Sequence, residues 1–259
     1  MFCFDDMEYA DMKPKMLRLA FLSLFVLSLA SVSYAQPALI EVRDVHVKPG
    51  QIAQYEAAIK ESIAFRQENN FPFAVRAFQA EPDHYRYVTF LGDWDGRDTI
   101  REWFAPIVTG EPPDFARAFS EATVSQAVSY ERSRPNLWHN PEDPPVTLNT
   151  AGAIHELRLY PMSHTIRQVA DLLERFAALY EAQAVPGSKF VWQQAVGSDL
   201  PMFTQYFPTA DAASYYAERA AAMESMGSDF QALLQELGPL LRKIENVSWT
   251  SRHDLTYLP

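Results

Sequence analysis

Val128-Ser129-Tyr130, near the middle of this chain, is echoed 119 residues later by Val247-Ser248-Trp249. A second echo lies upstream of each copy, where Asp114-Phe115 matches Asp229-Phe230 at an offset of 115 residues. Two ordered matches at similar offsets predict a duplicated domain. The two tripeptides are then expected to occupy equivalent positions on the closing strands of two similar units.

The elements expected around these echoes follow the same order in both halves. Runs of β-branched and aromatic residues predict strands, and apolar residues at helical spacing predict helices. In the first half the expected strands are 39–47, 73–80, 85–91 and 124–132, with helices near 52–63, 100–107 and 114–122. In the second half they are 153–160, 190–196, 202–207 and 243–252, with helices near 166–180, 210–223 and 228–241. Each half therefore has the β-α-β-β-α-β order of a ferredoxin-like (split βαβ) unit, and the fold class is α+β.

Composition divides the chain into four segments. We expect ferredoxin-like units at residues 36–135 and 152–259, joined by a semi-rigid linker at 136–151 that is rich in proline. Residues 1–35 are expected to be an N-terminal extension and signal peptide.

The N-terminal segment has the parts of an export signal. Lys13 and Lys15 precede a short apolar run, and Ser33-Tyr34-Ala35 follows it, so cleavage is expected after Ala35. Translation could begin at Met1 or at Met12. A membrane anchor is the alternative, but the uninterrupted run of 12 residues is shorter than the roughly 20 that span a bilayer. These features predict a periplasmic or secreted protein that does not associate with membranes after cleavage.

Charge and cysteine content narrow the range of partners. The net charge is −11, and removal of residues 1–35 takes away three basic and four acidic residues, which leaves −10. Such a surface repels phosphate backbones, so no nucleic-acid partner is expected. Cys3 is the only cysteine and would be lost with the signal peptide, which fits an exported bacterial protein without disulfides.

The element order, together with an Asp93-Trp94-Asp95 turn that enters a helix after the third strand, resembles the dimeric α/β-barrel superfamily. That superfamily includes antibiotic-biosynthesis-type monooxygenases and NIPSNAP-like proteins. The resemblance implies that both units pack their sheets into one intramolecular barrel around a cavity, so that a monomer with a pseudo-dimeric fold replaces a homodimer. The haem-degrading branch relies on a His in the helix after the third strand. The expected helices at 96–107 and 210–223 contain no His, so no haem or other cofactor is expected.

Alternation along the first strand of each unit sorts residues between the helix side and the cavity. Val45, Val47, Leu157 and Leu159 suit the helix side. The residues left to face the cavity are Asp44, His46, Glu156, Arg158 and Tyr160. Titratable groups in a partly apolar cavity can catalyse proton transfer, with His46 or Asp44 as base and Arg158 stabilising an oxyanion. The alternatives are a salt-bridged patch, such as Arg158 with Glu156 or Asp44, and a metal site built from His46, Asp44 and Glu156.

The closing strands supply the other candidate ligand contacts. Tyr130 and Trp249, with Arg132 in step with Tyr130, would form an aromatic wall for a flat ligand if they face inward. Simple core packing is the alternative for these aromatic residues. Two functions follow from these patterns. The first is an exported small-molecule-binding or accessory protein of unknown ligand, with a small aromatic or apolar molecule as the expected occupant of its barrel cavity. The second is a cofactor-independent monooxygenase or isomerase that acts on such a molecule.

Overall fold

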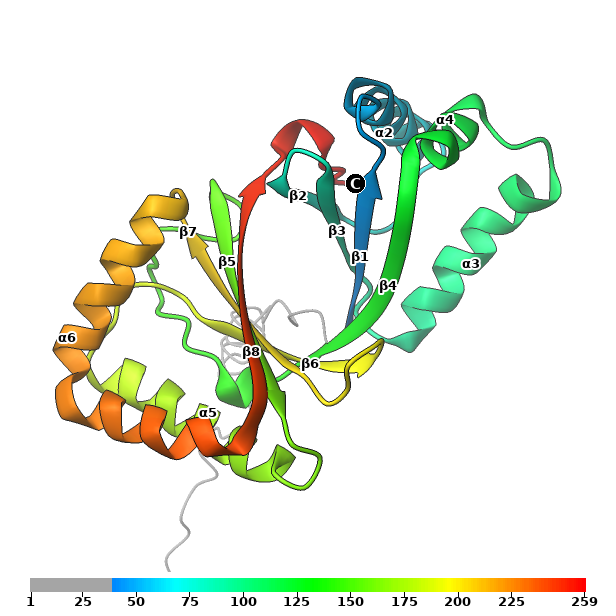
Figure 1. Ribbon diagram of the computed structural model, residues 1–259. Coiled ribbons are helices and arrows are strands. Elements are labelled where there is room, and N and C mark those ends of the chain that lie inside the picture. Colours follow the sequence, from blue (N-terminus) through cyan, green and yellow to red (C-terminus); the bar gives the residue numbers. More distant parts are fainter. Residues whose placement is uncertain (1–38) are drawn as a thin grey trace, which may run out of the picture. The chain divides into compact units, whose positions relative to one another are not determined.

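The computed structural model describes residues 39–259, which form two successive β-α-β-β-α-β units (Figure 1). The first unit contains β1 (Leu39–Val47), α2 (Ile52–Glu68), β2 (Val75–Glu81), β3 (His84–Phe90), α3 (Trp94–Thr109), α4 (Asp114–Ala122) and β4 (Thr123–Ser133). The second contains β5 (Ala153–Pro161), α5 (Ile166–Ala182), β6 (Phe190–Val196), β7 (Phe203–Thr209), α6 (Ala212–Leu237) and β8 (Leu241–Ser251). Short 3-10 turns lie at Pro135–Leu137, Gly238–Leu240 and His253–Leu255. The element order expected from the sequence is confirmed.

The eight strands close into one antiparallel barrel in the order β1-β3-β2-β8-β5-β7-β6-β4. Two junctions between the units complete the ring. Phe78 of β2 pairs with Ser251 of β8, and Glu131 of β4 pairs with Gln194 of β6. Because both units contribute to a single ring, the intramolecular α/β barrel predicted by the resemblance is present within one chain.

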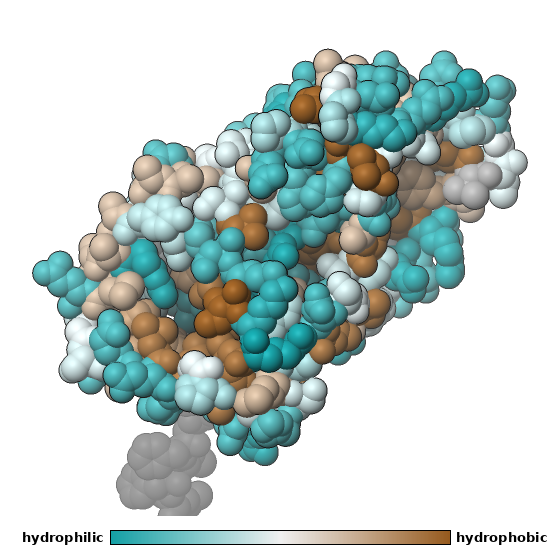
Figure 2. Space-filling view, in the orientation of Figure 1, coloured by the Kyte–Doolittle hydropathy of each residue, from teal (hydrophilic) through white to brown (hydrophobic). Residues whose placement is uncertain are grey.

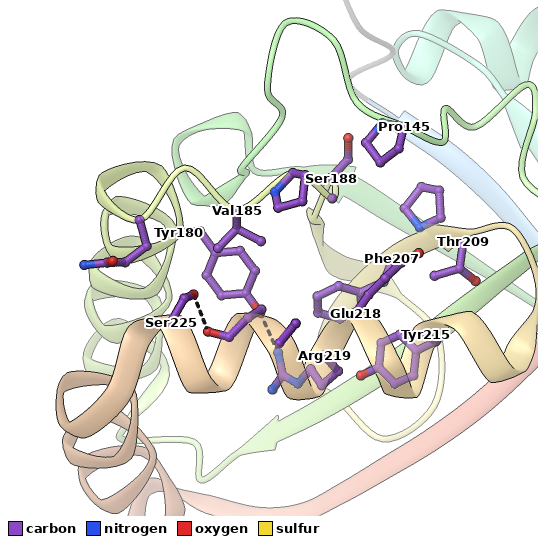
Figure 3. A pocket seen from close by; sticks show the side chains of 16 residues that line it. Pro145, Tyr180, Val185, Ser188, Phe207, Thr209, Tyr215, Glu218, Arg219 and Ser225 are labelled. Atoms are coloured by element: carbon purple, nitrogen blue, oxygen red, sulfur yellow. Dashed lines mark hydrogen bonds between the residues drawn. The ribbon is translucent and has the colours of Figure 1, made fainter.

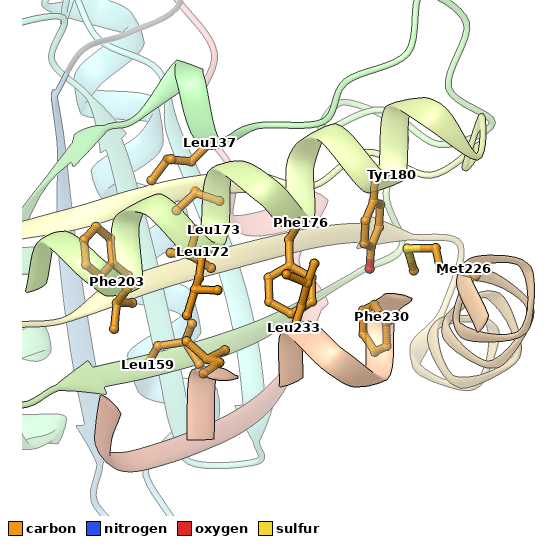
Figure 4. Close-up of a cluster of buried hydrophobic side chains, with 14 of the residues drawn as sticks. Leu137, Leu159, Leu172, Leu173, Phe176, Tyr180, Phe203, Met226, Phe230 and Leu233 are labelled. Carbon is orange, nitrogen blue, oxygen red and sulfur yellow. The ribbon is translucent and has the colours of Figure 1, made fainter. Parts of the chain in front are cut away.

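Helices cover the outside of the ring in two separate layers (Figure 1). On the first unit, Tyr55 and Ile59 of α2 pack with Val45, Val47 and Tyr85 of the sheet. On the second unit, α5 and α6 face each other over the sheet in a larger apolar cluster, shown in Figure 4. Its buried side chains include Leu159, Leu173, Phe176, Phe203, Phe230 and Leu233. The helix-side positions expected for Val45, Val47 and Leu159 are therefore confirmed.

A third apolar cluster fills much of the ring interior. Inward positions of seven of the eight strands contribute to it, because side chains alternate between the two faces of a strand. The cluster includes Ile40, Val42, Phe78, Val88, Ile154, Phe190, Trp192, Tyr206 and Trp249. The polar groups described below lie among these side chains.

The strand register corrects the predicted equivalence of Tyr130 and Trp249. Ile40 of β1 pairs with Glu131, and Ile154 at the matching position of β5 pairs with Trp249. Glu131 is therefore the structural counterpart of Trp249, and Tyr130 is the counterpart of Ser248. The sequence echo aligns Tyr130 with Trp249, whereas the strand pairing aligns Glu131 with Trp249, one residue later. A slip of one residue moves a strand residue to the opposite face of the sheet.

Helix α6 contains the boundary that the sequence predicted between two helices. Gly227 has φ of +53° and breaks the helical path between Ala212 and Leu237. A positive φ at this point favours glycine, which has no side chain to clash. At its start, α6 is capped by Asp211, whose carboxylate accepts a hydrogen bond of 2.7 Å from the amide of Ser214. The bend lets the first part of α6 lie over β7 while the second part runs along α5 (Figure 1).

The predicted signal peptide, residues 1–35, lies outside the described residues. Within residues 39–259, no helix is both long and apolar enough to cross a membrane. Polar residues cover most of the face shown in Figure 2, and hydrophobic residues appear there in separate patches.

Candidate functional site

The ring interior contains a buried ion-pair network centred on Arg86 of β3. Its Nε and Nη2 atoms each donate a 2.7 Å hydrogen bond to the carboxylate of Asp44, and its Nη1 atom lies 2.6 Å from Oε2 of Glu156. Arg86 is 3% exposed and Glu156 is 0% exposed. Asp44 lies on β1 and Glu156 on β5, so this one guanidinium joins the two units.

Glu156 has three donors around its carboxylate. Arg158 donates hydrogen bonds of 2.8 and 3.1 Å, and the indole of Trp249 donates one of 2.7 Å. The guanidinium of Arg86 also lies 4.3 Å from the centroid of the Trp249 ring. Burial opposes ionisation of this carboxyl, but the charges of Arg86 and Arg158 outweigh it and lower the pKa of Glu156 to about 2. The carboxylate is therefore ionised at neutral pH, and both of its oxygen atoms are bound by these donors.

A second buried carboxyl, Glu131 of β4, has the opposite electrostatics. It accepts hydrogen bonds from Thr204 at 3.2 Å and Tyr206 at 3.1 Å, both on β7 of the other unit. Burial, followed by the negative charge of Glu156, raises the pKa of Glu131 to about 7. A carboxyl group that is partly protonated at neutral pH thus sits beside one that is ionised.

The five residues predicted to face the cavity lie in or beside this network. Asp44, Glu156 and Arg158 belong to it, whereas Tyr160 donates a 2.6 Å hydrogen bond to Glu245 at its edge. His46 is exposed and stacks on His84, with ring centroids 4.1 Å apart. Asp44 is held by the Nε and Nη2 donors of Arg86, so neither it nor Glu156 is a free base. The alternative of a salt-bridged patch, with Arg158 paired to Glu156, describes these contacts. Within residues 39–259, no group of three or more His, Cys, Asp or Glu side chains is placed to hold a metal ion.

Tyr130, Arg132 and Trp249 do not form one aromatic wall. The Tyr130 hydroxyl donates a 3.0 Å hydrogen bond to Glu41 on the outer face of the ring. Arg132 lies on the same face, 5.8 Å from the centroid of the Trp94 ring, and Trp249 points inward. The inward position expected for Tyr130 is wrong because of the one-residue slip described above.

A pocket of about 320 Å³ lies outside the ring, between α5, α6, β7 and the segment that leads into β6 (Figure 3). We call it the α5–α6 pocket. This volume is at the lower end of the roughly 300–1,000 Å³ typical of small-molecule sites. The lining is largely aromatic and apolar and includes Tyr180, Val185, Pro186, Phe207, Pro208, Tyr215 and Ala222, with Ser188, Thr209, Glu218 and Arg219 as its polar members.

One hydrogen bond and two shifted pKa values set the chemistry of the α5–α6 pocket. Arg219 donates a 2.5 Å hydrogen bond to the hydroxyl of Tyr180 (Figure 3). Burial raises the pKa of Tyr180, so this phenol stays protonated at neutral pH. Burial, and then the charge of Asp211, raises the pKa of Glu218. The pocket thus offers aromatic faces for a flat molecule and one guanidinium for an oxygen atom.

The α5–α6 pocket does not suit haem. Its lining contains no His, Cys or Met, which are the usual axial ligands, and the Tyr180 hydroxyl is already bound by Arg219. Helices α3 and α6 also contain no His.

The sequence patterns did not indicate Arg86, Glu131 or the α5–α6 pocket. Arg86 could have been found by alternation, because it lies between Tyr85 and Tyr87 on a strand that pairs with β1. Glu131 was hidden by the incorrect alignment of Tyr130 with Trp249. The pocket combines residues from α5, β7 and α6 that are far apart in the chain, and no local pattern indicates their convergence.

Comparison with solved structures places this architecture among known proteins. An anthrone oxidase-like protein matches with a TM-score of 0.57 and 11% identity, over 85% of this chain and 93% of the other. The chain has the dimeric α/β-barrel fold. A candidate monooxygenase from Lactobacillus acidophilus NCFM matches at 0.52 with 9% identity, over 85% and 95% of the two chains. A chlorite dismutase variant from Candidatus Nitrospira defluvii matches at 0.50 with 8% identity, over 83% and 92%.

These identities show a shared fold and carry no activity from one protein to another. No family model and no curated protein matches the sequence. The duplicated ferredoxin-like architecture is therefore what this chain shares with the monooxygenase-like and chlorite dismutase structures.

Proposed function

We propose that this protein binds a small aromatic or apolar molecule in the α5–α6 pocket. The observation that carries the proposal is the pocket itself, which combines a volume suited to a molecule of one or two rings with the faces of Tyr180, Phe207 and Tyr215. Arg219 supplies one directional polar contact for an oxygen atom of the ligand. Such a pattern of apolar walls with few polar groups is typical of ligand sites.

The sequence patterns predicted that this ligand binds inside the ring. The ion pairs inside the ring favour the α5–α6 pocket instead. Asp44, Arg86, Glu156 and Arg158 satisfy one another, and a ligand there would have to break buried ion pairs. Removing one partner from such a pair costs about 3–5 kcal/mol. A ligand in the α5–α6 pocket would not have to break any of these ion pairs.

A cofactor-independent oxygenase or isomerase that acts on the same molecule is the second candidate. It is favoured by the pairing of Arg219 with Tyr180 on the pocket wall, because a guanidinium and a phenol can stabilise an oxyanion. The names of the anthrone oxidase-like and candidate monooxygenase structures also point in this direction, by fold analogy alone. Oxygen uptake with a bound phenol would indicate an oxygenase, and rearrangement of the ligand without oxygen uptake would indicate an isomerase; neither change would indicate simple binding.

Binding can be tested by thermal shift and calorimetry with 4-bromobenzyl alcohol as the probe. A ligand at 100 times its Kd stabilises a folded protein by about 2.7 kcal/mol, which is readily measured as a rise in Tm. The blocking variant is Gly187→Leu, because Gly187 lines the pocket and an added Cβ would meet only Glu218, at 4.0 Å. The matched control is Gly238→Leu, whose added Cβ meets nothing within 4 Å and which does not line the pocket.

The proposal predicts a rise in Tm for the unmodified protein and for Gly238→Leu, and a much smaller rise for Gly187→Leu. Equal stabilisation of all three proteins would place the ligand elsewhere. No stabilisation by the alcohol or by related phenols would remove the proposed function.

We also propose that the protein works after export to the periplasm or beyond, as a single chain. The basic residues, apolar run and Ser33-Tyr34-Ala35 sequence support export, and closure of the ring within one chain supports the monomer. The mass of the protein recovered from a periplasmic extract and its size in solution test the two statements separately.

A further inference from the structure

Lys189 is a buried lysine without a polar partner for its side chain. It precedes β6, and its backbone forms two hydrogen bonds with His139, of 2.9 and 2.7 Å. The side chain is 1% exposed and lies in the layer between the sheet and the two helices α5 and α6. Within the described part of the chain, its Nζ atom has no hydrogen-bond partner.

The surroundings of Nζ favour the uncharged amine. The side chains around it are mainly apolar, including Leu157, Phe176 and Phe230. The nearest aromatic ring is that of Tyr180, with its centroid 4.8 Å from Nζ. Burial, and then the positive charge of Arg219, lowers the pKa of Lys189 to about 7. A large share of the side chain is therefore a free, nucleophilic amine at neutral pH.

Lys189 adjoins the α5–α6 pocket through two shared residues. A small cavity of about 30 Å³ is lined by Lys189, Tyr180 and Arg219, among others. Tyr180 and Arg219 also line the 320 Å³ pocket, so their hydrogen bond stands between the amine and that pocket. A cavity holds a water molecule when the centre of a water-sized sphere can move through about 10–15 Å³ of it. The small cavity exceeds this volume, so it has room for a carbonyl group. A shift of the Arg219 side chain would join the two spaces.

We propose that Lys189 is a covalent binding residue whose Nζ forms an imine with an aldehyde or ketone ligand of the α5–α6 pocket. The amine lone pair attacks the carbonyl carbon, and one proton moves from nitrogen to the former carbonyl oxygen to give a carbinolamine. The carbinolamine oxygen then takes a proton from the Tyr180 hydroxyl, the C–O bond breaks to release water, and the second nitrogen proton passes to the Tyr180 oxygen as the C=N bond is completed. No oxidant or reductant takes part.

The groups around the amine suit these steps. Arg219 can donate to the carbonyl oxygen as negative charge develops on it, and the protonated Tyr180 hydroxyl can supply the proton that the departing water needs. The apolar walls exclude water that would hydrolyse the product. This inference rests on the proposed function, because the ligand's body must occupy the α5–α6 pocket.

The test compares 4-bromobenzaldehyde with 4-bromobenzyl alcohol on the full chain at pH 7. Both molecules fit the same pocket, and only the aldehyde can form an imine, which sodium cyanoborohydride reduces to a stable secondary amine. Peptide mass mapping then locates the adduct. An ordinary surface lysine holds roughly a thousandfold less free amine at this pH. After allowing for limited access, we expect Lys189 to be modified at least about tenfold faster than the exposed Lys60.

Two variants complete the design. Lys189→Met removes the amine while keeping an unbranched apolar side chain, so it should retain binding of the alcohol and lose the dominant adduct. Lys60→Met is the matched control and should keep both. Alcohol binding in the pocket without preferential modification at residue 189 would overturn this inference and leave the proposed function intact. Absence of binding by either molecule would overturn both.

Discussion

Glu156→Gln tests whether the buried network inside the ring stabilises the fold. The substitution keeps the size of the side chain and removes the negative charge that Arg86 and Arg158 contact at 2.6 and 2.8 Å. The ion-pair partners left to the two guanidinium groups would be Asp44, for Arg86, and the partly exposed Glu245, for Arg158. The change should destabilise the protein because it leaves buried positive charge without compensation.

Two independent routes give the same magnitude. The pKa of Glu156 falls from its ordinary value of 4.5 to about 2. At about 1.4 kcal/mol per pH unit, this difference corresponds to roughly 3 kcal/mol. Measured losses on breaking buried ion pairs are about 3–5 kcal/mol. Because the folded-state pKa is lowered, this stabilisation is complete above pH 4.5 and is lost as the pH falls toward 2.

Urea denaturation at pH 7 measures the effect directly. We expect Glu156→Gln to lose about 3 kcal/mol, and the difference from the unmodified protein to shrink as the pH falls below 4.5. Glu245→Gln is the matched control, because Glu245 is one-third exposed and its pairs should contribute at most about 1 kcal/mol. A loss of less than about 1 kcal/mol for Glu156→Gln, equal to the control, would refute the reasoning.

Three further predictions concern titration and processing. Burial raises the pKa of Glu131 to about 7. The contribution of Glu131 to the free energy of unfolding is therefore complete below pH 4.5 and is lost as the pH rises through 7. Glu131→Gln should abolish this pH dependence when unfolding is measured across that range. The lowered pKa of Lys189 means that stability should rise between pH 7 and 10.5, and Lys189→Met should be more stable at pH 7 and lack the rise. Intact-mass measurement of exported protein should give a chain that begins at Gln36, and retention of Cys3 would contradict the predicted cleavage.

Alternation along β1 and β5 predicted three of the titratable residues that enter the ring, but it also pointed inward His46, which is exposed, and Tyr160, which lies at the edge of the network. Asp44, Glu156 and Arg158 do so because each side chain points away from its neighbours on a strand, whatever the strand pairs with. The sequence could not show that Arg86 neutralises two of them. That contact depends on which strands are adjacent across the two units, and adjacency is a property of the closed ring.

The error at Tyr130 has a different origin. The letters Val-Ser-Tyr and Val-Ser-Trp match at an offset of 119, whereas the strand partners Ile40 and Ile154 place equivalent positions 118 residues apart. The offset of 118 was visible in Arg134 and Arg252 farther along the same echo. A similarity of letters is a weak guide to register, because one residue of slip exchanges the two faces of a strand.

Lys189 shows what no local pattern could predict. A lysine before an apolar strand ordinarily ends in solvent, and Ser188-Lys189-Phe190 gives no other sign. Its burial arises because α5 and α6, which flank β6 and β7 in the sequence, close over it. The same packing creates the α5–α6 pocket, so the pocket and the amine were hidden for the same reason.

The most direct test of the central claim is a crystal structure of the protein soaked with 4-bromobenzyl alcohol, in which anomalous scattering locates the bromine atom. We predict one bromine site between α5 and α6, against Tyr180, Phe207 and Tyr215, with the ion pairs of Arg86 unchanged inside the ring. A bromine site within the ring beside Trp249, with the α5–α6 pocket unoccupied, would contradict it.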